Sequence, residues 1–193
     1  MDSDAIAVML AGCRRGDTAA WDALVEAYWQ RLYGYALRAT KNSELARDLV
    51  QETFLRIVQK IEKYDHQGKF EAWLFRILVN LVRDHGRVSA RRPVRSTVSK
   101  DGDGTNDITD DLPGKSPSPA DFLQHDEDVL RMEAALGRLS EIDRQVLLLR
   151  HYGDMPFKDI ARVLNCPIGT VLARAHRAMG KLRLLMEVTD EKS

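Results

Sequence analysis

The chain has 193 residues, of which 44% are hydrophobic and 30% charged, so it is long enough for one or two small globular domains. No apolar run approaches the roughly 18 residues that a membrane-spanning helix needs, and the first residues carry acids where a secretion signal carries positive charge. We therefore expect a cytoplasmic protein without membrane insertion. The two cysteines, Cys13 and Cys166, form no CxxC pair, which predicts neither a zinc site nor a disulfide framework.

The formal net charge of zero hides three blocks of different charge. Residues 1–95 carry 16 Lys and Arg against 12 Asp and Glu, residues 96–128 carry 2 against 9, and residues 129–193 carry 11 against 8. The two ends are therefore mildly basic and the middle is strongly acidic. A basic end attracts the phosphates of a nucleic acid, whereas the acidic middle is repelled by them.

The first strong helical pattern starts at Asp17–Thr18, where Asp17 can cap the first turn. The apolar residues that follow recur with the period of one helix face, and they are Trp21, Leu24, Val25, Tyr28, Trp29, Leu32 and Ala36. Aromatic residues at this spacing are typical of a hydrophobic core and not of a ligand box, so we interpret this helix as packing.

The second predicted helix follows Asn42–Ser43, which can cap it. Its buried side is expected to hold Ala46, Leu49, Val50, Phe54, Ile57 and Ile61. The opposite side gathers four polar residues and one leucine, namely Glu44, Asp48, Gln51, Glu52 and Leu55. An acidic face with an exposed leucine is either solvated surface or a docking face for a partner protein, and the pattern alone leaves both open.

Carboxylates four residues apart also suggest a hydrolase or a helical di-metal site, which uses Glu-x-x-His pairs. The sequence contains no such pair. Because Asp48 and Glu52 lack a histidine partner and a second carboxylate helix in matching register, they are poor candidates for catalysis. We predict no catalytic residue, no metal site and no cofactor, and hence no enzymatic activity.

A third helix is predicted from about Phe70, with an apolar face of Phe70, Trp73, Leu74, Ile77, Leu78 and Leu81. Its other face carries side chains that bind phosphates or read base edges, and they are Arg76, Asn80, Arg83 and Arg87. In the loop before this helix, Tyr64 and His66 either stack on unpaired bases or cover the core, and the sequence favours neither role.

The apolar periodicity ends at about Val88, and the following stretch is rich in Gly, Pro, Ser and Asp, which predicts a flexible linker with a basic start and an acidic remainder. Order is expected to return with a helix that carries Val129, Met132, Leu136 and Leu139. Ser140 then caps a further helix, whose apolar residues are Ile142, Val146, Leu147 and Leu149.

The segment from Pro156 to Arg183 reads as a helix-turn-helix. Its first helix opens near Pro156, stops at Asn165-Cys166-Pro167 and has an apolar face of Phe157, Ile160, Ala161 and Leu164. Its second helix starts at Pro167 and is expected to bury Ile168, Val171, Ala175, Ala178, Leu182 and Leu185. The cationic outer face then holds Thr170, Ala173, Arg174, Arg177 and Lys181. This geometry suits a DNA major groove, although a solvated basic face is the competing interpretation.

No stretch of the chain alternates apolar and polar residues over the length of a strand, so the fold class is predicted to be all-α. We expect two small helical domains, at residues 1–88 and 128–193, joined by a flexible acidic linker at residues 89–127, with the helix-turn-helix in the second domain.

These blocks together resemble the extracytoplasmic-function (ECF) sigma factors, the small two-domain promoter-recognition subunits of bacterial RNA polymerase. The matching stretches of the first domain are RDLVQETFLRI and FEAWLFRILVNLVRDHGR. Those of the second are LSEIDRQVLLLRHYGD, FKDIARVLNCPIGTV and ARAHRAMGKLR. The resemblance covers nearly everything except the linker, and it rests on the order and separation of the blocks as well as on each block.

The resemblance implies that the protein binds core RNA polymerase and promoter DNA and helps to melt the promoter. The polymerase-binding segment, which docks on the coiled coil of the largest subunit, corresponds to Asp48, Gln51, Glu52, Phe54 and Leu55. The residues that correspond to readers of the downstream (minus ten) element are Tyr64, His66, Arg76, Asn80, Arg83 and Arg87. Those that correspond to readers of the upstream (minus thirty-five) element are Thr170, Arg174, His176, Arg177 and Lys181. An anti-sigma factor is the further partner that the family implies.

The chain departs from the family pattern at Leu172 and Ala173, where a basic residue and a serine are common. Upstream readout is therefore expected to rest on Arg174, His176 and Arg177 and on DNA shape. Two rival functions remain to be weighed. A stand-alone helix-turn-helix regulator would use the first domain for sensing or dimerisation, and a helical metal-dependent enzyme would need the Glu-x-x-His pairs that are missing.

Overall fold

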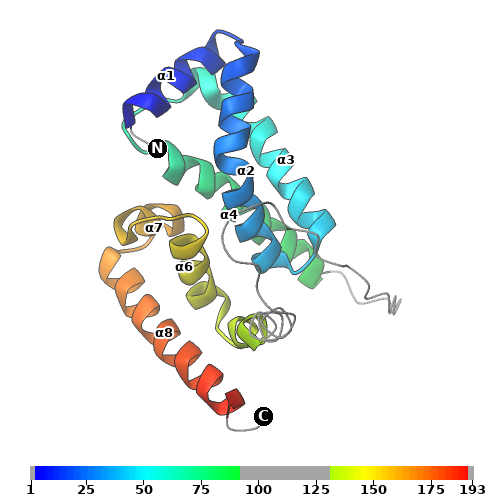
Figure 1. Ribbon diagram of the computed structural model, residues 1–193, viewed down its shortest axis with the longest axis vertical. Helices are drawn as coiled ribbons and strands as arrows, with labels where there is room; N and C mark the ends of the chain where they lie inside the picture. Colours follow the sequence, from blue (N-terminus) through cyan, green and yellow to red (C-terminus); the bar gives the residue numbers. More distant parts are fainter. Residues whose placement is uncertain (1–2, 92–130, 191–193) are drawn as a thin grey trace, which may run out of the picture.

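The computed structural model describes residues 3–91 and 131–190 of the chain, and within these two ranges all regular structure is helical, which confirms the predicted fold class. The first range holds α1 (Ser3–Arg14), α2 (Thr18–Thr40), α3 (Ser43–Lys60), the short 3-10 helix η1 (Ile61–Lys63) and α4 (Phe70–Arg91). The second holds a helix at residues 131–137, then α6 (Glu141–His151), α7 (Phe157–Leu164) and α8 (Ile168–Asp190). Figure 1 shows the first group in the upper part of the molecule and the second in the lower part.

The predicted helix starts are confirmed by their side-chain caps. The Asp17 carboxylate accepts a hydrogen bond from the backbone N–H of Ala19, with N and Oδ1 3.0 Å apart. Asn42 caps α3 in the same way, since its Oδ1 lies 2.9 Å from the backbone nitrogen of Leu45. A short polar side chain in this position satisfies an N–H that has no partner inside the helix, and this fixes where the helix begins.

The first group of helices surrounds an aromatic core. Tyr28 and Tyr35 of α2 make edge contacts with Phe70 and Phe75 of α4, with ring centroids 5.6 and 6.3 Å apart, and all four side chains are buried. The registers of α2 and α4 are close to those predicted, but Val25, which was expected in the core, is 37% exposed. The buried residues of α2 are Leu24, Tyr28, Leu32, Tyr35 and Ala36.

Helix α1 is not among the predicted elements. Its buried residues recur at helical spacing and are Ile6, Met9, Leu10 and Cys13, so the apolar pattern was present in the sequence. The helix packs on α2 and on η1. Arg14, in its last turn, donates hydrogen bonds to the backbone carbonyls of Ile61 and Tyr64 and so ties α1 to the loop before α4.

The second group of helices contains the predicted helix-turn-helix. Helix α7 follows Pro156 and ends at Asn165, whose φ of 52° is in the left-handed region that asparagine tolerates. Ile168, which was expected to be buried, is 49% exposed, and two other apolar residues of the expected helices, Met132 and Ile142, are 39% and 44% exposed. Gln145 is buried on α6, where its Oε1 accepts a hydrogen bond from Arg83 of α4 at 3.0 Å and its Nε2 donates to Glu141 at 3.1 Å.

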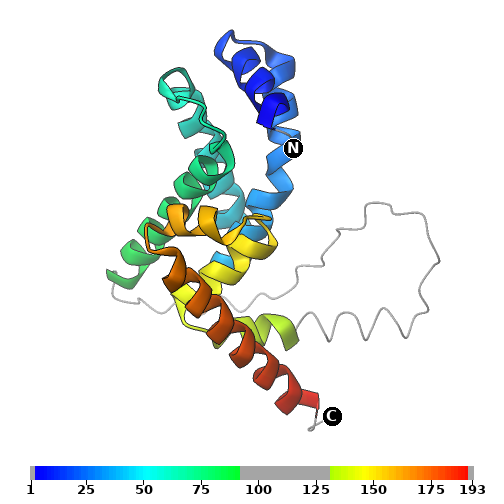
Figure 2. The same ribbon diagram turned by 90° about the vertical axis from the view of Figure 1, so that its left-hand side faces the viewer.

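The two groups are packed against each other through α2 with α6 and α4 with α7 (Figures 1 and 2). Most of their buried apolar residues form one continuous cluster. Helix α8 lies on the far side of α6 and α7 from the first group, so its outer face points away from the rest of the molecule.

Candidate polymerase and nucleic-acid interfaces

The outer face of α3 is acidic and apolar at once. Asp48 and Gln51 are exposed, and so is Leu55, with 57% of its surface open to solvent. Val58, one turn further, is 52% exposed and extends the same apolar strip, although sequence reasoning did not single it out. The sequence could have indicated this, because residues three apart on a helix lie on the same face and Val58 follows Leu55 by three. Exposed large apolar side chains among charged ones are typical of a protein-binding surface.

Two other residues of this face have partners inside the molecule. Glu52 forms a surface ion pair with Arg56, with Oε1 and Nε 2.8 Å apart, one helical turn along α3. Phe54 is half-buried and stacks on Trp29 of α2, with ring centroids 6.3 Å apart and ring planes within 6° of parallel. The stacking fixes the position of α3 against α2, and Phe54 contributes only its open side to the surface.

The four residues of the predicted downstream stripe lie along α4, and two of them are bound to the second group of helices. The Arg76 guanidinium donates to the backbone carbonyl of Arg162 in α7 at 3.0 Å. The Arg83 guanidinium donates to Oε1 of the buried Gln145 in α6, also at 3.0 Å. Asn80, Arg83 and Arg87 line an open groove of about 870 Å³ whose opposite wall is α6. The stripe therefore faces the second domain.

The loop before α4 holds Tyr64 against the core. Its ring stacks on Trp73 at 4.4 Å between centroids and meets Phe70 edge-on at 5.8 Å. Burial raises the pKa of the Tyr64 phenol above its usual value. The sequence left two roles open for Tyr64, stacking on bases or covering the core. In this structure Tyr64 covers the core.

His66 is the neighbour of Tyr64 in the same loop, and both of its ring nitrogens are shielded from solvent without a hydrogen-bond partner. It lines a small cavity of about 140 Å³ with Lys69 and with Asp159 of α7. An imidazole without partners can accept or donate a hydrogen bond to a ligand that reaches it.

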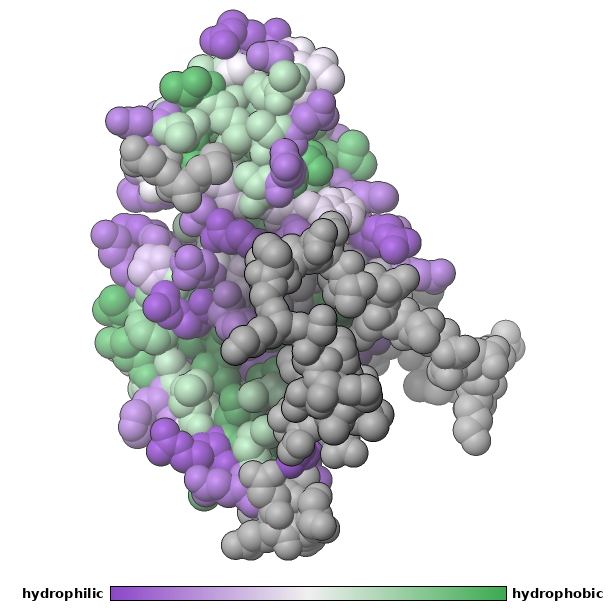
Figure 3. Space-filling model, in the orientation of Figure 1, coloured by the Kyte–Doolittle hydropathy of each residue, from purple (hydrophilic) through white to green (hydrophobic). Residues whose placement is uncertain are grey.

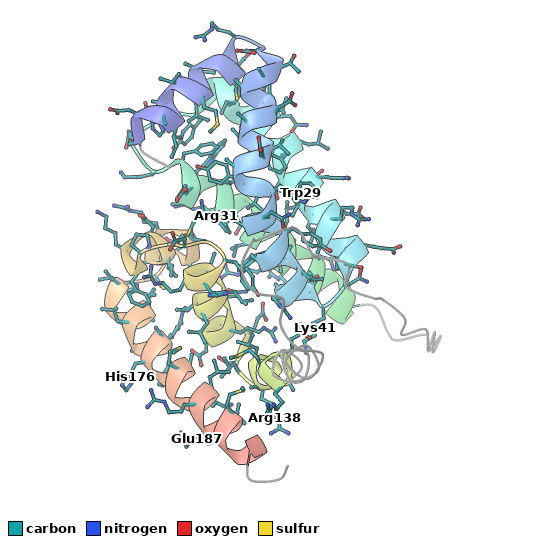
Figure 4. All side chains as sticks on the ribbon, viewed as in Figure 1. Trp29, Arg31, Lys41, Arg138, His176 and Glu187 are labelled. Carbon is teal, nitrogen blue, oxygen red and sulfur yellow. The ribbon has the colours of Figure 1, made fainter. Side chains whose placement is uncertain are left out.

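The outer face of α8 presents the predicted upstream residues. His176 projects from the helix away from the rest of the molecule (Figure 4). The Arg177 side chain is 67% exposed, and its guanidinium lies 3.8 Å from the Asp143 carboxylate of α6. The Lys181 ammonium donates to the backbone carbonyl of Arg138 at 2.8 Å. Arg177 and Lys181 therefore lie on the side of α8 that faces α6 and residue 138, whereas His176 lies on the outer side of the helix.

Arg174 and Thr170 are nearer to the turn. The Arg174 guanidinium lies 3.9 Å from the Cys166 sulfur, which places it over the turn between α7 and α8. Thr170 is half-buried at the start of α8, and its N–H donates to the carbonyl of Pro167 at 3.0 Å. In Figure 3 hydrophobic surface also appears on this side of the molecule, and the exposed apolar residues of α8 include Ile168 and Leu172.

Among residues 3–91 and 131–190, no group of three or more His, Cys, Asp or Glu side chains is placed to hold a metal ion. Both cysteines have free thiols. In the same part of the chain, the helices are too short or too polar to cross a membrane.

Comparison with known proteins agrees with this division into two groups of helices. Residues 24–92 match the family model of sigma-70 region 2, and residues 130–182 match that of sigma-70 region 4. The RNA polymerase sigma-H factor of Pseudomonas aeruginosa is 30% identical over 169 residues, which cover 86% of this chain and 85% of the relative. The ECF sigma factor EcfG of Rhodopseudomonas palustris is 33% identical over 157 residues, covering 81% and 80%. The chain belongs to the ECF sigma factor family.

A solved structure extends the likeness of this ECF sigma factor to the fold. CnrH, in its complex with the cytosolic domain of CnrY, superimposes with a TM-score of 0.68 at 26% identity, and the match covers 97% of this chain and 99% of CnrH. The sigma-factor resemblance seen in the sequence is thus confirmed. The faces of α3 and α4 fall within the region 2 match and the face of α8 within the region 4 match, whereas α1 precedes both.

Proposed function

We propose that this ECF sigma factor directs transcription initiation through three separate surfaces, one for each partner that the family implies. The outer face of α3 binds core RNA polymerase through the coiled coil of its largest subunit. The stripe on α4 and the preceding loop bind the melted downstream element. The outer face of α8 binds the upstream element in the major groove.

The observation that carries this proposal is the outer face of α3. Asp48, Gln51 and Leu55 are exposed together, and α3 lies on the side of α2 away from α6–α8 (Figure 1). A partner can therefore reach this face without disturbing either DNA-binding surface. Acidic side chains around an apolar strip give both electrostatic steering and a desolvated centre to an interface.

The proposed domains are those expected from the sequence, with polymerase and downstream binding in residues 1–88, a linker at 89–127 and upstream binding in 128–193. The protein acts in the cytoplasm and has no enzymatic activity of its own. CnrH was solved with a domain of CnrY bound, and a second sigma factor, RpoE of Bartonella quintana, with its anti-sigma factor NepR. By analogy we propose that an anti-sigma factor regulates this chain too.

The decisive experiment is a pull-down of core RNA polymerase with the full-length protein, followed by promoter-dependent transcription and permanganate footprinting of the melted region. Retention of polymerase, specific transcripts and reactive thymines near the start site are expected. A protein that binds promoter DNA tightly but never retains polymerase would instead be a stand-alone regulator.

A further inference from the structure

Helix α8 carries a row of large apolar side chains on its surface. The members of this apolar row are Ile168, Leu172 and Met179, and Leu172 and Met179 are 46% and 54% exposed. They follow one another at intervals of four and seven residues, which place side chains on one side of a helix. Neighbouring apolar side chains that remain in water are typical of a binding surface, because a partner that covers them gains their burial.

Leu172 lies on the side of α8 that faces away from the other helices. It precedes His176 by one helical turn, and His176 projects away from the rest of the molecule (Figure 4). The opposite side of α8 supplies the buried residues Val171, Ala175 and Ala178. The packing of α8 against α6 and α7 therefore does not use the Leu172 side chain, which is open to a partner that approaches from outside.

The charges of α8 indicate the chemistry of that partner. Between Ile168 and Met186 the sequence contains four Arg and Lys residues and no Asp or Glu. Arg174 lies over the turn before α8, and Arg177 lies toward α6. An apolar centre with cations at its borders matches a DNA major groove, where phosphates line the edges and base edges form the floor.

The chemistry of the bases decides what Leu172 can recognise in such a groove. A leucine side chain forms no hydrogen bond with a base edge, and thymine is the base that presents an apolar group there, its C5-methyl group. The polar groups of the other bases would lose water against Leu172 without gaining a hydrogen bond. Ala173, the exposed neighbour of Leu172, is small and so allows the helix to approach the groove floor.

We propose that Leu172 selects thymine at one position of the upstream element, through contact between its side chain and the C5-methyl group. This inference rests on the proposed binding of the upstream element by α8. It adds a specificity-determining residue that works without a hydrogen bond to those that carry charge. The preference at that position then depends on a single methyl group of the DNA.

The test uses the full-length protein assembled with core RNA polymerase. Its preferred upstream element is first selected from a duplex promoter library that is randomised over this element. Each thymine of the selected element is then replaced singly by deoxyuridine, which lacks the C5-methyl group and forms the same base pair. At one position the replacement should weaken promoter binding about fourfold, the factor that corresponds to one buried group of this size.

Two variants and a control connect that position with Leu172. In Leu172→Ala the thymine and deoxyuridine promoters should bind equally well. Leu172→Arg should change the preferred base at this position to guanine, because a guanidinium donates two hydrogen bonds to O6 and N7 of guanine. Leu184→Ala changes another exposed leucine of α8, about 18 Å further along the helix, and should keep the fourfold difference.

The outcomes distinguish this inference from the proposed function. If an upstream element is selected but no deoxyuridine weakens binding, or the difference persists in Leu172→Ala, the role of Leu172 is overturned and binding by α8 stands. If no sequence is selected over the upstream element, binding by α8 is itself overturned, whereas retention of polymerase through α3 is measured separately. A free protein that is a dimer by analytical ultracentrifugation and becomes a monomer in Leu172→Ala would assign the apolar row to self-association and overturn the proposal.

Discussion

The outer faces of α3 and α4 carry similar patterns, yet they differ in their hydrogen bonds to the second group of helices. Each is a row of charged and polar side chains at helical spacing. On α3, Asp48 and Gln51 are exposed, whereas on α4 both Arg76 and Arg83 donate hydrogen bonds to the second domain. A helical stripe therefore predicts which side chains share a face. Whether that face is free for a partner depends on tertiary contacts.

The largest effect is expected on the free face. Asp48→Lys combined with Glu52→Lys should abolish binding to core polymerase, because it reverses the charge of the docking surface. The fold should be retained, since Asp48 is exposed and Glu52 loses only a surface ion pair with Arg56, worth about 0.2–1 kcal/mol. Asp4→Lys with Glu62→Lys is a control with the same charge change at other exposed positions. Unchanged polymerase affinity in the first variant would contradict the assignment.

The stripe on α4 leads to a second expectation, that the free protein binds duplex promoter DNA weakly. Arg76 and Arg83 are already hydrogen-bonded to the second domain, and the acidic block of residues 96–128 opposes the approach of phosphates. Core polymerase should raise both the affinity and the sequence specificity. Binding titrations over a range of salt concentrations, with and without core enzyme, measure this. Tight, sequence-specific binding of duplex promoter DNA by the protein alone would contradict this expectation.

The third expectation separates two exposed cations of α8. Arg177→Ala should cost roughly 1–3 kcal/mol and relax the preference at one base pair of the upstream element, if its guanidinium contacts guanine through two hydrogen bonds. Lys181→Ala should weaken binding to all sequences alike and lower the salt slope by about one unit. Transcription from a promoter library compares the two variants. An Arg177→Ala protein with an unaltered preference would assign readout to Arg174, His176 or DNA shape.

The smallest effect concerns alkaline stability. Burial raises the pKa of Tyr28 and of Tyr35 above the usual 10.0, and the nearby Glu71 carboxylate raises that of Tyr28 further. Because the folded state disfavours the phenolate, the contribution to stability is complete below about pH 10 and is lost as the pH rises above it. Urea unfolding between pH 8 and 11 should show this decline, with a shallower slope in Tyr35→Phe. An identical slope in that variant would show that Tyr35 ionises freely in the folded protein.

The parts of the fold that were predictable depend on local chemistry. Asp17, Asn42 and Ser140 mark helix starts because a short polar side chain caps the backbone beside it. Ile168 was misplaced because apolar periodicity names a face without saying which neighbour will cover it. No element of the described chain fully covers Ile168.

The candidate sites divide in the same way. The stripe on α4 and the outer face of α8 follow from helical spacing alone. The close contact between the Tyr152 ring and the backbone of Gly34 joins residues 118 positions apart, and no pattern along the chain connects them. A glycine inside a long apolar helix was the only local sign that something approaches closely there.

Helix α1 has a consequence for the design of hybrid sigma factors. It precedes the region 2 match, yet its Arg14 donates hydrogen bonds to the backbone carbonyls of Ile61 and Tyr64. Ile61 is the first residue of η1, and Tyr64 follows η1 at the start of the loop before α4. Promoter specificity can be exchanged by moving this loop into another sigma factor. If the transferred segment began at residue 24, where the family match begins, it would lack Arg14 and its two hydrogen bonds to the loop. The N-terminal helix should travel with the loop as one module.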